Sequence, residues 1–129
     1  MMLKLLAAQD HQPPAQGDAR TVALPNDADA LALPLDGVER VDLHFPSFTD
    51  GRAFSQAFLL RRRRGFAGDI RATGDVLIDQ LVQMQRTGFS SAVLREGVDV
   101  ADAQRQFELF PGFYQGDAVQ PQPHFAKAA

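Results

Sequence analysis

The segment Val41–Gly65, VDLHFPSFTDGRAFSQAFLLRRRRG, contains a strand, a loop and a helix in that order, and the rest of the chain is organised around it. Apolar and polar residues alternate over Val41–Phe45, which is typical of a strand. Residues 46–52 predict a loop, and a helix-length amphipathic segment follows at 53–64. Gly65 provides a natural helix end. The segment therefore predicts one β-α unit.

Two further units repeat this order along the chain. Their strands, turns and helices are predicted at 69–73, Gly74 and 75–87, and then at 90–95, 96–97 and 100–110, where Pro111 ends the last helix. A helix between consecutive strands leaves no room for a hairpin, so the strands should be parallel. We expect a small single α/β domain with consecutive β-α-β-α-β-α units and a three-stranded parallel core.

The predicted strands have one apolar face and one polar face. Val41, Leu43 and Phe45 alternate with Asp42 and His44, and the other two strands show the same pattern. Parallel strands covered on both faces usually read as continuous apolar runs, so we expect the helices mainly on one face. The polar face could be covered by the N-terminal strands or a second subunit, form the wall of a partial barrel, or be an open binding face.

The N-terminal part predicts two more strands, at 3–6 and 21–24, separated by a polar loop with prolines and a glycine. Residues 25–37 fit either a short helix or a turn and strand. We divide the chain into a short strand and polar loop at 1–20, a single α/β domain at 21–115, and a flexible tail at 116–129.

Composition excludes several classes of protein. A chain of 129 residues has room for one domain, and its formal net charge of -3 argues against a nucleic-acid-binding protein. The absence of cysteine excludes disulfides, thiolate metal sites and a cysteine nucleophile. The apolar N-terminus is too short for a signal peptide, and no stretch is long enough to span a membrane, so we expect a cytoplasmic protein.

Candidate site residues lie where the predicted strands end. The loop after the first core strand carries Asp50 and Arg52, with Ser55 just inside the next helix, and the second turn carries Asp75, with Asp79 one turn later. Ligands of open α/β sheets collect at this edge. Both loop aspartates could instead cap helices, and the adjacent glycines could take positive φ. Arginine beside a helix N-terminus opposes the dipole, which favours an Asp50, Arg52, Asp75 network.

Other charged residues have simpler explanations. The run Arg61–Arg64 complements the C-terminal dipole of its helix and should be a solvated face or a patch for an acidic partner. Arg71 lies mid-strand on the polar face, where Asp42 is its expected partner. The three histidines are far apart in sequence and no nucleotide-binding glycine motif occurs, so we expect no metal site and no bound cofactor.

Several motifs together resemble a bacterial family catalogued as domain of unknown function 934 (DUF934), over about residues 22–115. The motifs are FPSFTDGRAFSQA at 45–57, LLR at 59–61, GDIRATGDVL at 68–77, DQ at 79–80, RTGF at 86–89 and YQ at 114–115. Ala53 stands where the family often has a second glycine, and Thr87 replaces a frequent cysteine. Thiol chemistry therefore cannot be the common mechanism of the family.

The resemblance implies a role as an accessory of assimilatory sulfite reduction, because members are often encoded beside sulfite reductase and some carry an oxidoreductase label. The accessory would help electron delivery by docking on sulfite reductase or its electron donor. The alternative is a small oxidoreductase or anion-binding enzyme with its site at Asp50, Arg52 and Asp75. A third alternative is a homodimer that buries its polar sheet faces together.

Overall fold

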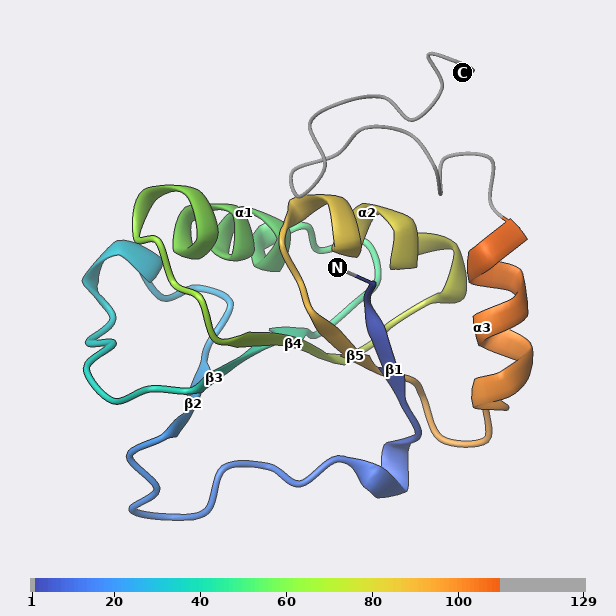
Figure 1. Cartoon of the computed structure of the whole chain (residues 1–129), viewed down its shortest axis with the longest axis horizontal. Helices are drawn as coiled ribbons and strands as arrows, with labels where there is room; N and C mark the ends of the chain where they lie inside the picture. Colours follow the sequence, from blue (N-terminus) through green and yellow to red (C-terminus); the bar gives the residue numbers. More distant parts are fainter. Residues whose placement is uncertain (1, 110–129) are drawn as a thin grey trace.

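The computed structural model describes residues 2–109 and contains one five-stranded sheet with helices (Figure 1). The strand order is β1-β5-β4-β3-β2, and every neighbouring pair is parallel. The strands are β1 (Lys4–Leu6), β2 (Thr21–Leu24), β3 (Arg40–Phe45), β4 (Asp69–Gly74) and β5 (Ser91–Val93). The predicted α/β class and the parallel core are confirmed.

Within residues 2–109, three α-helices accompany the sheet, and the first two lie over the same face of it (Figure 1). They are α1 (Arg52–Phe58), which continues as a π-helical turn η3 (Leu59–Arg63), α2 (Leu81–Thr87) and α3 (Val100–Leu109). Short 3-10 turns occur at η1 (Ala8–Asp10), η2 (Ala30–Ala32) and η4 (Ile78–Gln80). The predicted end of the last helix at Phe110 and the predicted tail at 116–129 lie outside the described residues.

The predicted start of the second helix is wrong. The helix was expected at 75–87, but α2 begins at Leu81, after extended backbone at Leu77 (φ -103°, ψ 147°) and the turn η4. Asp75 does not cap a helix, because its carboxylate accepts hydrogen bonds from residues of other loops. The apolar stripe is nevertheless buried, since Val76, Leu81 and Met84 all belong to the core.

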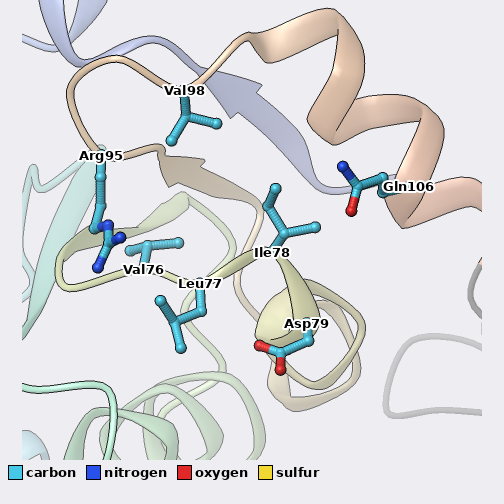
Figure 2. Close-up of a pocket in the computed structure, with 7 residues that line it drawn as sticks. All are labelled: Val76, Leu77, Ile78, Asp79, Arg95, Val98 and Gln106. Carbon is cyan, nitrogen blue, oxygen red and sulfur yellow. The ribbon is translucent and has the colours of Figure 1, made fainter.

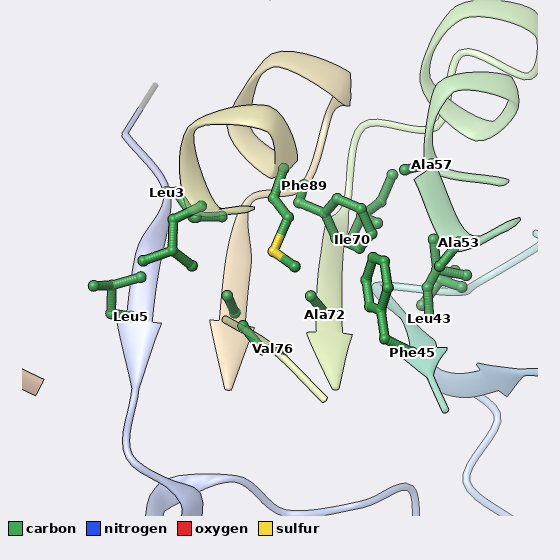
Figure 3. Close-up of a cluster of buried hydrophobic side chains, with 14 of the residues drawn as sticks. Leu3, Leu5, Leu43, Phe45, Ala53, Ala57, Ile70, Ala72, Val76 and Phe89 are labelled. Atoms are coloured by element: carbon green, nitrogen blue, oxygen red, sulfur yellow. The ribbon is translucent and has the colours of Figure 1, made fainter. Parts of the chain in front are cut away.

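The core lies between the sheet and its helices (Figure 3). Alternate residues of the central strands, including Leu43, Phe45 and Ala72, are fully buried there. Phe45 lies edge-on to Phe54 of α1, with ring centroids 5.0 Å apart, and also packs on Phe89. Burial of apolar surface, to which these rings contribute, is the main stabilising contribution in a domain of this size. The period-two pattern therefore identifies the core face correctly.

The N-terminal strands extend the sheet at its two opposite edges, where β1 pairs with β5 and β2 pairs with β3. The connection between β1 and β2 runs along the side of the sheet opposite α1 and α2 (Figure 1). His11 of this connection reaches Asp42 and Arg71 on the polar face. Part of the chain itself, rather than a stacked layer of strands, therefore covers the middle of that face.

No helix within residues 2–109 is long and apolar enough to cross a bilayer.

Candidate functional site

The loops after β3 and β4 emerge side by side at the carboxyl edge of the sheet. Phe45 and Gly74, the last residues of the two strands, are paired in register. The backbone N–H of Phe48 donates to Asp75 Oδ2 at 2.9 Å, and Gln80 Nε2 donates to the Phe48 carbonyl at 2.8 Å. One rim therefore carries residues from both predicted loops.

Asp75 pairs with Arg95, a residue that the sequence did not single out. Arg95 Nη1 donates to Asp75 Oδ1 at 2.8 Å. The hydrogen bond from Arg95 and the N–H of Phe48 both stabilise the carboxylate, so they lower the pKa of Asp75 from its usual 3.8. Its position at the end of the third predicted strand, on the same edge of the sheet, is the feature of the sequence that could have identified Arg95 as a site residue.

The expected network of Asp50, Arg52 and Asp75 forms only in part. Asp50 accepts hydrogen bonds from Asn26 Nδ2 at 2.8 Å and from the Arg52 N–H at 3.1 Å, which opens α1. Arg52 Nε lies 3.9 Å from Asp50 Oδ1, and its side chain is 66% exposed. Gly51 has φ -90°, so the expected positive φ is wrong there. Asp75 is joined to this loop through Phe48, not through Arg52.

The two remaining predicted residues of this edge have different surroundings. Ser55 lies on the exposed side of α1, one turn beyond the rim. Asp79 is exposed in η4 and lines a hollow together with Arg95 (Figure 2). Among residues 2–109, no three histidine, aspartate or glutamate side chains gather as a metal site would require.

Arg71 belongs to a second cluster, on the polar face of the sheet. Its guanidinium donates to Asp69 Oδ2 at 3.1 Å and to Ser91 Oγ at 3.0 Å, and Nη1 lies 3.2 Å from His11 Nδ1. The expected ion pair with Asp42 is therefore replaced by one with Asp69.

Asp42 has its own partner on the same strand. Arg40 holds both carboxylate oxygens, at 2.8 and 3.1 Å, and His11 Nε2 lies 3.8 Å from Asp42 Oδ2. Burial is the main reason why the pKa of His11 is lowered below 6.5; Arg71 and Arg40 lower it further, and Asp42 opposes the shift. His11 thus separates the two groups that the sequence predicted to pair.

The arginine run at the end of the first helical segment is partly structural. Arg61 donates to the carbonyls of Gly88, Phe66 and Gly68 at 2.6 to 2.8 Å, and Arg64 donates to the Ala30 carbonyl at 2.9 Å. Arg62 and Arg63 are exposed. The prediction of a solvated face or a patch for an acidic partner is wrong for Arg61 and Arg64, because their guanidinium groups donate to backbone carbonyls of the protein itself.

Comparison with known proteins identifies a family. No curated protein and no solved structure matches the chain. A family model does match, over residues 21–125, which is most of the sequence. The chain belongs to the family described as bacterial protein of unknown function (DUF934).

Proposed function

We propose that this protein is an accessory of assimilatory sulfite reduction that docks, through its carboxyl-edge rim, on an acidic surface of sulfite reductase or of its electron donor. The pathway is the one that the family resemblance implies. The observation that carries the docking role is an exposed aromatic ring on the loop after β3 together with an exposed guanidinium at the start of α1. Phe48 is 48% exposed, and the side chain of Arg52, four residues later, is 66% exposed.

The electrostatics of Arg52 favour an external carboxylate. A positive charge in the first turn of α1 is unfavourable to the helix dipole. Asp50 offsets it weakly, because the two side chains approach only to 3.9 Å and Asp50 also accepts hydrogen bonds from Asn26 and from the backbone. A carboxylate of a partner can therefore bind the guanidinium in a bidentate manner and stabilise it.

Phe48 is presented in a fixed backbone position. Its N–H is held by Asp75 and its carbonyl by Gln80, so little loop entropy remains to be lost on binding. Aromatic and arginine side chains are enriched in the central contacts of protein interfaces. A protein without cysteine that docks in this way would help electron delivery by positioning donor and acceptor.

A pull-down from an extract of the native host tests the proposal. The wild-type protein should retain sulfite reductase or its electron donor at low salt and release it as salt is raised, because charge complementarity is screened. The double variant Phe48→Ala, Arg52→Ala should retain neither. Failure of the wild-type protein to retain either one at low salt would count against the proposal.

A matched control uses another phenylalanine and arginine of the same helical segment. Phe58 is 47% exposed, nearly as much as Phe48, and Arg63 is exposed in η3. The double variant Phe58→Ala, Arg63→Ala removes the same side chains from a different surface. It should bind as the wild type does, and equal loss in both variants would show that the rim is not the docking surface.

The exposed guanidinium of Arg52 also favours a second candidate function, an enzyme that binds a small anion at this rim. Sulfite is the probe that the pathway suggests. Titration calorimetry should then show binding that Arg52→Ala abolishes while the circular dichroism spectrum stays unchanged. Absence of sulfite binding, or binding that the substitution leaves unaltered, would remove this candidate without affecting the docking proposal.

A further inference from the structure

A hollow of about 360 Å³ lies beside the carboxyl ends of β4 and β5, next to the rim (Figure 2). Its apolar lining is aliphatic and comes from Val76, Leu77, Ile78 and Val98. The volume falls within the range of small-molecule sites, and the position is the one where parallel α/β sheets bind ligands. Branched aliphatic walls suit an aliphatic group.

The polar part of the lining consists of Gln106 and two side chains of opposite charge, Arg95 and Asp79. Figure 2 shows their charged ends apart from each other, with the side chain of Leu77 between them. The ion pair with Asp75 engages Nη1 of Arg95 and fixes the guanidinium, while the side chain stays 53% exposed. Further N–H groups of Arg95 can therefore bind a ligand carboxylate without reorganisation of the side chain.

Asp79 supplies the complementary group. It lies in η4, is exposed, and forms no ion pair with any other residue in the range 2–109. A ligand with only a negative charge would leave this carboxylate unmatched, and a ligand with only a positive charge would leave Arg95 unmatched. Opposite charges around an aliphatic lining therefore favour a ligand that carries both signs.

We propose that this hollow binds a small aliphatic zwitterion whose ammonium and carboxylate are separated by a hydrocarbon chain, with its carboxylate on Arg95, its ammonium on Asp79 and its chain against Leu77, which lies between them. This inference is independent of the docking proposal, because it uses neither Phe48 nor Arg52. It assigns a ligand class to the predicted site residue Asp79.

Three probes that share one linear pentyl chain test the charge requirement. They are 6-aminohexanoate, hexanoate, which lacks the ammonium, and pentylamine, which lacks the carboxylate. Titration of the full chain by NMR should show binding of 6-aminohexanoate with shifts of the methyl signals of Leu77 and Ile78. Each analogue should bind at least about tenfold more weakly.

Variants then test the assigned contacts. Asp79→Asn should weaken binding of 6-aminohexanoate about tenfold and should not weaken binding of hexanoate, since that probe has no ammonium. Asp27→Asn is the matched control, because Asp27 is exposed and lies outside the hollow, and it should bind 6-aminohexanoate normally.

The proposal is overturned if 6-aminohexanoate at millimolar concentration shifts none of the methyl signals of the hollow. It is overturned equally if hexanoate binds as tightly as 6-aminohexanoate, or if Asp79→Asn and Asp27→Asn behave alike. None of these results depends on whether sulfite reductase is retained in the pull-down, so the two proposals fail separately.

Discussion

Arg95 and Asp75 form an ion pair at 2.8 Å that joins the end of β5 to the residue following β4. The same carboxylate accepts the N–H of Phe48, from the loop after β3. One side chain therefore holds three neighbouring loops of the carboxyl edge. Each of these loops follows a strand of the parallel sheet, so the Asp75–Arg95 pair holds the three loops together as one rim.

Asp75→Asn should loosen this rim while the core stays folded. The amide side chain cannot form the ion pair with Arg95, and the N–H of Phe48 loses an ionised acceptor. Amide hydrogen exchange measured by NMR should become faster at Phe48 and remain unchanged in β4. Equal exchange at Phe48 in the variant and the wild type would show that the carboxylate does not anchor the loop.

The hydrogen bonds of the Asp75 carboxylate should depend on pH only at acidic pH. The folded-state pKa of Asp75 lies below its usual 3.8, so its contribution is fully present above that value and is lost as pH falls through the lower folded pKa. Exchange at Phe48, corrected for its intrinsic pH dependence, should therefore accelerate below pH 3.8 in the wild type alone. A transition of the same size in Asp75→Asn would assign it to another group.

His11 should make the stability of the fold fall on mild acidification. Arg71 donates toward Nδ1 of the ring, an arrangement that requires an unprotonated nitrogen, and the pKa of His11 is lowered from 6.5. Because the pKa of His11 is lower in the folded state than in the unfolded state, the neutral ring stabilises the fold. This contribution to the free energy of unfolding is fully present above the unfolded-state pKa. That contribution is lost as pH falls through the folded value.

Urea unfolding at several pH values measures this effect. Between pH 7 and about pH 5, the wild type should lose more of its free energy of unfolding than His11→Gln, which cannot titrate in that range. The charged groups around the ring are Asp42, Arg71 and Arg40, and all three are present in both proteins. Parallel curves for the two proteins would contradict the prediction.

Gly74→Ala should destabilise the protein by about 1 to 3 kcal/mol, because the residue has φ +91° and its missing Cβ faces occupied space. An added Cβ would collide with the Phe45 carbonyl and lie 2.7 Å from His44 Cε1. Gly97 has φ +87° but nothing within 4 Å of that position. Gly97→Ala is thus a control for backbone strain alone, and it should lower the free energy of unfolding, measured with urea, by less than Gly74→Ala does. Equal losses in the two variants would show that the collision at Gly74 does not contribute.

The features that the sequence predicted are those encoded locally. Alternation over Val41–Phe45 identifies the core face, and Gly74 takes the positive φ expected of its turn. The start of α2 was missed because Val76 and Leu77 fit a helical stripe as well as an extended segment that enters the core. The hydrogen bonds of Asp75 with two other loops favour the extended conformation, and these contacts are not visible in the local sequence.

The partners of the charged residues could not be predicted for a related reason. Strand neighbours follow from register, which places Arg71 beside Asp42. The segment that carries His11 crosses the sheet from a distant part of the sequence, and no local pattern indicates where it comes to lie. Arg40 is the partner of Asp42 instead. This pair could have been predicted from the sequence, because residues two apart on one strand lie on the same face of the sheet.

Arg61→Ala should be among the more damaging single substitutions in the chain. The guanidinium is half-buried and donates to the carbonyls of Gly88, Phe66 and Gly68, which belong to two different loops. Its removal leaves three part-buried acceptors without this donor, and each unpaired acceptor costs about 1 kcal/mol or more. We expect a loss of about 2 to 4 kcal/mol in the free energy of unfolding, measured with urea.

Two further variants separate the hydrogen bonds of Arg61 from its charge. Arg61→Lys keeps the charge but cannot reproduce the planar set of donors, so it should recover less than half of the loss. Arg63→Ala removes an equal charge from an exposed position of the same turn and should change stability by at most about 0.5 kcal/mol. Full recovery by lysine would indicate that the positive charge near the helix end matters. Equal losses in Arg61→Ala and Arg63→Ala would contradict the role of the three carbonyls.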